Sequence, residues 1–119
     1  MSDFLCFRVP GKPQGKQRAR RGRNGRFYTP AETVAYERRV AWAAKQAMTK
    51  PMGDYRGPVV LSVLCYFGDH RRRDGDNVLK AVADSLNGVA YHDDSQVTDA
   101  RVRVMYGDPR TTVLVRWGR

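Results

Sequence analysis

The sequence predicts an α/β (α+β) fold: a single domain with elements in the order β-α-β-α-β-β and two helices packed on one side of a mixed sheet. Three observations support this fold. The chain has 119 residues, which suits one domain. Apolar runs of strand length alternate with two segments of helical periodicity. The last two apolar runs are separated only by the short turn Gly107-Asp108-Pro109-Arg110.

The N-terminal part of the chain predicts a strand followed by a long basic loop. Residues 4–9 are rich in apolar side chains, and Pro10-Gly11 ends the run. Residues 10–28 combine glycines and prolines with many basic side chains and show no apolar periodicity. We expect this segment to be a loop that is mobile when no ligand is bound.

The segment Thr29-Pro30-Ala31-Glu32 predicts the start of the first helix. The threonine is the expected N-cap, the proline takes the first helical position, and the glutamate completes a capping box. An apolar stripe continues to about Lys50, and Pro51 ends the helix.

The rest of the chain predicts three strands and a second helix. Residues 59–67 form a strongly apolar run between glycine and proline residues, which is typical of a buried strand. Residues 76–87 have apolar side chains on one helical face, and Asn87-Gly88 closes this second helix. Residues 97–106 and 111–117 are the last two predicted strands.

Several classes of protein are excluded by composition. Cys6 and Cys65 lie in apolar stretches without a paired spacing, so we expect reduced core thiols and no zinc site. No apolar run approaches the roughly 20 residues of a membrane span, and the first residues do not resemble a signal peptide. We expect a cytoplasmic protein.

Charge is distributed unevenly along the chain. The formal net charge is +10, so an anionic polymer is the expected partner. No acidic residue occurs between Asp3 and Glu32, whereas most acids fall in residues 69–99. The candidate DNA-binding residues are those of the N-terminal basic segment and the arginine run at 71–73: Lys12, Lys16, Arg18, Arg20, Arg21, Arg23, Arg26, Arg71, Arg72 and Arg73.

The acidic segment has the pattern of a metal site. Asp74 and Asp76 project together if the chain is extended before the second helix. Asp84 lies on the polar stripe of that helix, and the pair Asp93-Asp94 would approach Asp74 only if the chain folds back along the helix. Converging carboxylates repel one another unless a cation lies between them. Hard cations such as Mg²⁺ accept oxygen ligands, with Mn²⁺ a possible substitute.

Other interpretations of this segment remain open. The acids fit almost equally well as a charged helix cap and turn without chemistry. If the metal site hydrolyses a phosphodiester, Lys80 could orient the attacking water or neutralise the charge of the pentavalent phosphorane. It also fits as an i,i+4 ion-pair partner of Asp76 and Asp84. An EF-hand starting at Asp74 fails because Ser85 replaces the required glutamate, and the segment from Gly11 is one residue short of a P-loop.

Two ordered sets of residues stand out: Arg72-Arg73-Asp74-x-Asp76-Asn77-x-x-Lys80 with Asp84, and Asp93-Asp94-Ser95-Gln96-Val97. On the N-terminal side, Arg18-Ala19-Arg20-Arg21, Tyr28-Thr29-Pro30 and Tyr36 precede them. In this combination nearly the whole chain resembles the RusA-type Holliday junction resolvases, a family common in phages and prophages.

The resemblance implies a Mg²⁺-dependent, homodimeric endonuclease of DNA recombination and repair that resolves four-way junctions by paired nicks. It implies that Asp74, Asp76 and Asp94 are catalytic and bind the metal, with Asp93 as a further candidate ligand, and that Lys80 is important for cleavage. No small-molecule cofactor beyond the divalent metal is expected. A nuclease of branched DNA without strict four-way preference and a non-catalytic basic DNA-binding protein are the alternatives.

The two aromatic residues at the end of the basic segment have two interpretations. Phe27 and Tyr28 fit as rings that stack on opened bases at the crossover. A core or helix-staple role is favoured for at least one of them.

Overall fold

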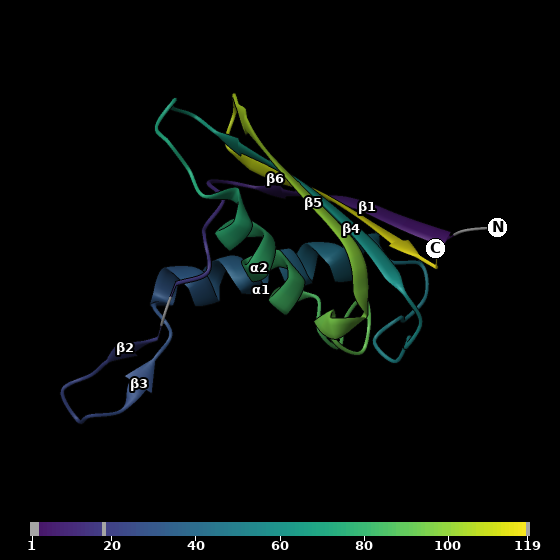
Figure 1. The fold of residues 1–119 in the computed structure, drawn as a ribbon, viewed down its shortest axis with the longest axis horizontal. Helices are drawn as coiled ribbons and strands as arrows, with labels where there is room; N and C mark the ends of the chain where they lie inside the picture. The colour runs from purple at the N-terminus through teal and green to yellow at the C-terminus, as the bar shows by residue number, and fades with distance from the viewer. Residues whose placement is uncertain (1–2, 18, 119) are drawn as a thin grey trace.

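Four strands form one mixed sheet in the computed structural model, which describes residues 3–17 and 19–118 (Figure 1). They are β1 (Asp3–Pro10), β4 (Val59–Phe67), β5 (Val97–Tyr106) and β6 (Arg110–Trp117), in the spatial order β1-β6-β4-β5. β6 pairs antiparallel with β1 and β4, whereas β5 pairs parallel with β4. The predicted mixed sheet and all four of its strands are confirmed.

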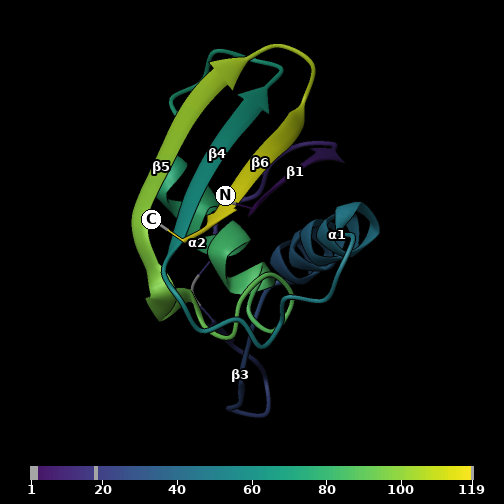
Figure 2. The ribbon, with the colours of Figure 1, turned by 90° about the vertical axis from the view of Figure 1, so that its right-hand side faces the viewer.

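Both predicted helices are present, and both lie on one side of the sheet (Figures 1 and 2). α1 (Ala31–Ala47) packs against β1, and α2 (Gly75–Ser85) packs against β4 and β5. Alternate residues of β4 are fully buried under the helices, as period-2 side-chain alternation requires. In residues 3–17 and 19–118, neither helix has the length and apolarity needed to cross a membrane.

The helix boundaries correct the capping prediction. Pro30 has an extended backbone and is itself the residue that flanks α1, so Thr29 lies one position too far away to cap it. No side chain caps this helix, and the predicted capping box does not form. The helix also ends at Ala47 rather than near Lys50.

The basic segment corrects a second prediction, because it is not wholly irregular. β2 (Arg20–Arg21) and β3 (Phe27–Tyr28) pair antiparallel as a two-stranded ribbon that projects away from the body of the domain (Figure 1). Both ribbon strands are exposed, so no core packing fixes them.

The two cysteines are free, as predicted, but only one is in the core. Cys65 is buried in β4 under the helices. Cys6 is exposed, because it alternates with the buried residues Leu5 and Phe7 of β1 and points to the helix-free face. The core-thiol prediction is therefore wrong for Cys6.

Candidate active site

The N-terminal end of α2 presents two of the predicted carboxylates. Asp74 is the N-cap: its Oδ1 accepts a hydrogen bond from the Asp76 backbone N–H at 3.0 Å. Its Oδ2 accepts from Asn77 Nδ2, also at 3.0 Å. Asp74 and Asp76 are both exposed, and the positive end of the helix dipole favours their negative charge. The pair is therefore locally ordered and open to solvent.

Gly75 lets this turn of α2 approach β5 closely. A Cβ atom at this position would lie 3.1 Å from Cγ2 of Val104 and 3.3 Å from Cγ2 of Val102. A larger side chain would push the helix away from the strand. The absence of a side chain thus fixes how near the Asp74–Asp76 end of α2 lies to the end of β5.

The C-terminal end of α2 holds a second carboxylate pair. A hydrogen bond with Asp84 raises the pKa of the Asp94 carboxyl; partial burial and the charges of Asp84 and Asp93 act in the same direction. Lys16 Nζ lies 3.1 Å from Asp84 Oδ2 and 3.0 Å from Glu37 Oε2. Burial by itself would lower the pKa of Lys16, but these hydrogen bonds and charges outweigh it and raise the pKa. Lys16 is therefore the local counter-ion of Asp84.

A short 3-10 helix, η1 (Asp94–Gln96), fixes the position of Asp94. Asp93 accepts hydrogen bonds from Ser95, which lower the pKa of the Asp93 carboxyl. The Gln96 side chain accepts from the Asp93 backbone N–H at 2.7 Å and donates to the carbonyls of Tyr55 at 2.8 Å and Gly57 at 2.9 Å. The sequence Asp-Asp-x-Gln thus encodes a capping box that is locked onto the loop before β4.

The two carboxylate pairs lie at opposite ends of α2. The helix has 11 residues, and at about 1.5 Å per residue it separates its ends by roughly 16 Å. Among the residues that the structure describes, no three His, Cys, Asp or Glu side chains are grouped so that they could hold a metal ion. The structure brings Asp84 to Asp94 and Asp74 to Asp76, but one chain does not bring Asp94 to Asp74.

Sheet topology explains why the expected fold-back does not occur. β4 and β5 are parallel, with Val59 beside Val97, so both strands start at the same end of the sheet. α2 connects the end of β4 to the start of β5 and must run antiparallel to both. Asp74 therefore lies at the strand ends, and Asp94 lies at the strand starts.

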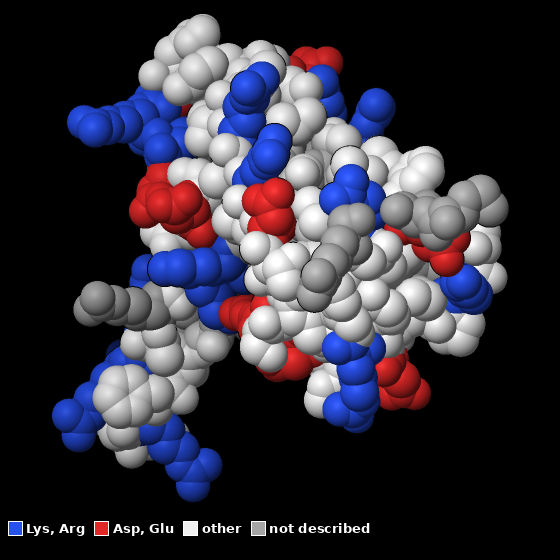
Figure 3. Space-filling model, turned by 45° about the vertical axis from the view of Figure 1, so that its right-hand side comes forward, with Lys and Arg blue, Asp and Glu red and all other residues white. Residues whose placement is uncertain are grey.

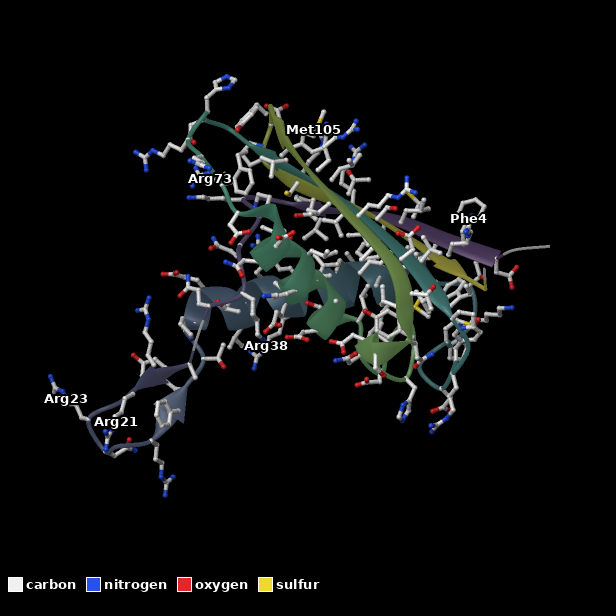
Figure 4. The ribbon with its side chains drawn as sticks, in the orientation of Figure 1. Phe4, Arg21, Arg23, Arg38, Arg73 and Met105 are labelled. Atoms are coloured by element: carbon white, nitrogen blue, oxygen red, sulfur yellow. The ribbon has the colours of Figure 1, made fainter. Side chains whose placement is uncertain are left out.

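The arginine run has one ordered member and two exposed ones. Arg73 Nη2 donates to Asp69 Oδ1 at 2.7 Å, and its guanidinium lies 4.7 Å from the centroid of the Phe67 ring. The buried Nε of Arg73 has no hydrogen-bond partner within the described residues. Arg71 and Arg72 are exposed. Figure 4 shows Arg73 near the end of the sheet where α2 begins.

A cavity of about 210 Å³ adjoins Asp74. It lies between the basic segment and α2, and its lining includes Lys12, Gly15, Arg73 and Asn77. The two cations give this cavity the chemistry of a phosphate site next to the Asp74–Asp76 pair.

The other basic candidates fall into two groups. Figure 3 shows basic but no acidic side chains on the projecting ribbon, and the sequence makes these arginines. Most members of the segment are exposed, whereas Lys16 is held in ion pairs at the root of the ribbon. Arg18 lies outside the described residues. The exposed members are Lys12, Arg20, Arg21, Arg23 and Arg26.

Three residues of this site, Lys16, Glu37 and Gln96, have structural roles that the sequence did not predict. Lys16 was a candidate DNA-binding residue, but its ion pairs with Glu37 and Asp84 form only through tertiary packing, and no local pattern in the sequence signals them. Gln96 could have been found, because an acid followed three residues later by glutamine is a capping-box pattern.

Comparison with known proteins identifies the family. Residues 10–116 match the family model described as endodeoxyribonuclease RusA. The chain belongs to the RusA family. The matched span includes the basic segment, both carboxylate pairs and most of the sheet.

Individual relatives agree with this assignment. The chain is 40% identical over 91 residues to the crossover junction endodeoxyribonuclease RusA of Escherichia coli (strain K12), covering 76% of this chain and 74% of the relative. It is 38% identical over 91 residues to the enzyme of the same name from Enterobacteria phage 82, with the same coverage. It is also 31% identical over 139 residues to the uncharacterized protein YqaN of Bacillus subtilis (strain 168), covering 96% of each chain.

Proposed function

We propose that this RusA-family protein is a Mg²⁺-dependent endonuclease that resolves four-way DNA junctions by paired, symmetric phosphodiester hydrolysis. We place this activity in DNA recombination and repair in the cytoplasm of a bacterial or phage-infected cell. The observation that carries the proposal is the arrangement of two carboxylate pairs at the ends of α2, beside a basic segment without acids. The names of the E. coli and phage relatives supply the class of substrate.

The carboxylates fit a hydrated divalent ion. Mg²⁺ in phosphoryl-transfer sites is commonly held by one or two carboxylates, with waters and substrate phosphate filling the other positions. We assign Asp74, Asp76 and Asp94 as the ligands, with Asp93 as a further candidate. When bound, the ion would lower the pKa of a water molecule and neutralise charge on the scissile phosphate.

Cationic side chains would hold the DNA around this site. Lys80 is exposed, and its spacing from Asp76 and Asp84 places it on the same stripe of α2. There it would neutralise charge that develops on the phosphate during cleavage. Arg73 and Lys12 would bind a neighbouring phosphate at the cavity beside Asp74.

A homodimer would complete the site that one chain leaves divided. β5 is an edge strand of the sheet and therefore offers unpaired backbone groups to a second copy. Antiparallel pairing of two β5 strands places the start of one beside the end of the other. Asp94 precedes the start of β5 and Gly75 contacts its end, so this pairing brings Asp94 of one copy toward Asp74 and Asp76 of the other. Two-fold symmetry also matches the equivalent phosphates of a junction.

A nicking assay on a synthetic four-way junction tests the function. We expect Mg²⁺-dependent paired nicks that EDTA abolishes, with little cleavage of linear duplex. Asp74→Asn combined with Asp76→Asn should abolish cleavage while junction binding in EDTA persists. Full cleavage by this double variant would refute the metal assignment. Equal cleavage of flaps and four-way junctions would show a nuclease of branched DNA in general, and no nicking by the wild type would show a DNA-binding protein.

Mixing two inactive variants tests the divided site. Consider a mixed dimer of one Asp74→Asn chain and one Asp94→Asn chain. If each site combines Asp74 of one chain with Asp94 of the other, one site has both native aspartates and the other site carries both substitutions. We expect single nicks to return on mixing. If each site comes from one chain, every site in the mixed dimer carries a substitution, and no activity returns.

A further inference from the structure

The β2–β3 ribbon exposes two aromatic rings away from the core. Phe27 is 72% exposed and Tyr28 is 50% exposed, although both belong to paired strands. Neither ring belongs to the hydrophobic core or to the set of apolar residues packed against it. The core and helix-staple interpretations of these residues are therefore wrong, and their exposure requires another explanation.

The ribbon pairs each ring with an arginine. Arg20 lies opposite Tyr28, and Arg21 lies opposite Phe27. Residues directly opposite in an antiparallel pair point to the same face, so each face of the ribbon carries one ring and one guanidinium. A ring that stacks on a base together with a cation that binds phosphate is the combination used to hold unpaired nucleic acid.

The turn of the ribbon is internally ordered. Gly22 N–H donates to the Arg26 carbonyl at 2.8 Å, and Gly25 N–H donates to the Gly22 carbonyl at 3.0 Å. Asn24 Oδ1 accepts from the Arg26 backbone N–H at 3.0 Å. Gly25 has φ +79°, which glycine adopts without strain. Ordering the turn in advance lowers the entropy lost when the ribbon binds.

The root of the ribbon lies against α2. Lys16 N–H donates to the Asn77 carbonyl at 2.8 Å, and a Cβ atom on Gly15 would lie 3.1 Å from Asn77 Cβ. The Lys16 side chain also reaches Asp84. The ribbon therefore starts at α2, where Lys16 contacts Asn77, the neighbour of Asp76 in the chain.

Chain length limits how far the rings lie from that root. Arg21 lies five residue steps after Lys16, so at about 3.3 Å per step the chain between them spans roughly 17 Å when extended. This equals about five base-pair steps of duplex at 3.4 Å each. A base held by Phe27, which pairs with Arg21, would therefore lie within about this span of Lys16, where the chain contacts α2.

We propose that Phe27 and Tyr28 stack on bases exposed at the branch point of the DNA, while Arg20 and Arg21 bind the adjoining phosphates. The faces of stacked base pairs are buried within a duplex. A branch point interrupts stacking and lowers the free energy needed to expose a base. The ribbon would thereby select branched DNA over linear duplex. This inference rests on the proposed function for its substrate class, but it concerns binding and can be tested without cleavage.

Binding is best measured in EDTA, with 2-aminopurine placed either at the branch point or inside one arm of a four-way junction. The wild type should raise the fluorescence of the probe at the branch point and leave the probe in the arm unchanged. Phe27→Ala combined with Tyr28→Ala should abolish the rise and weaken junction binding about ten-fold or more, because each stacked base contributes substantially. Affinity for linear duplex should change less than about two-fold.

Matched variants separate stacking from charge and from general effects. Phe27→Trp with Tyr28→Trp should restore the fluorescence rise, because any aromatic face can stack. Arg20→Gln with Arg21→Gln should weaken junction and duplex binding alike and flatten the salt dependence. Phe4→Ala is the control, because Phe4 is 68% exposed and lies at the opposite end of the molecule from Arg21 and Arg23 (Figure 4).

Three results would overturn the inference. If Phe27→Ala with Tyr28→Ala loses junction and duplex binding equally, the rings do not distinguish branched DNA from linear duplex. Unchanged junction binding would show that they make no contact. A change in dimer mass by sedimentation would show that the rings pack on a second copy. If the wild type cuts no junction but the ring variant still loses branch-point binding selectively, the proposed function fails and this inference stands.

Discussion

Replacing Gln96 with leucine should destabilise the protein and impair the presentation of Asp94. The amide of Gln96 makes three hydrogen bonds: one accepted from Asp93 and two donated to the carbonyls of Tyr55 and Gly57. Each such bond contributes about 1 kcal/mol net, and more where a half-buried group is left unsatisfied. The free energy of unfolding should therefore fall by about 2–4 kcal/mol, a large part of the roughly 5–15 kcal/mol typical of a domain.

Urea denaturation monitored by circular dichroism measures this change in the free energy of unfolding. Gln46→Leu, on the exposed face of α1, is the control. Because Gln96 also orders the turn that holds Asp94, nicking should fall even at temperatures where the variant is folded. A loss below about 0.5 kcal/mol together with full nicking would refute the reasoning, since that is the size of an ordinary surface substitution.

Three further outcomes are expected. The pKa of Asp94 is raised in the folded protein, so its contribution to the free energy of unfolding is fully present below the unfolded-state pKa of about 3.9. This contribution is lost as pH rises through the folded-state pKa. Asp84→Asn should flatten this part of the pH dependence in urea unfolding. Gly75→Leu should overpack the two valines of β5 and lower stability by about 1–3 kcal/mol in thermal unfolding, whereas unchanged stability would show that α2 can move away. Mg²⁺ should raise the melting temperature of the wild type but not that of the variant lacking the Asp74 and Asp76 carboxylates; equal shifts would place the ion elsewhere.

The strands were predictable because hydrophobic patterning reports burial directly. The apolar runs at residues 4–9 and 59–67 each placed a strand within one residue of its observed bounds. Helix ends were less predictable, because a cap depends on one residue: Pro30 took the flanking position expected for Thr29. The β2–β3 ribbon was missed because strands of two residues have no period and pack on no core.

Local sequence is enough to specify the chemistry of both halves of the candidate site. The Asp-x-Asp-Asn run encodes the capped start of α2, and Asp-Asp-x-Gln encodes the capping box that orders Asp94, because each depends on residues within one turn of one another. The positions of these two halves depend on the tertiary fold. A parallel β4–α2–β5 crossover places them at opposite ends of one helix. No single segment of the chain specifies this placement, because it depends on the relative direction of two strands.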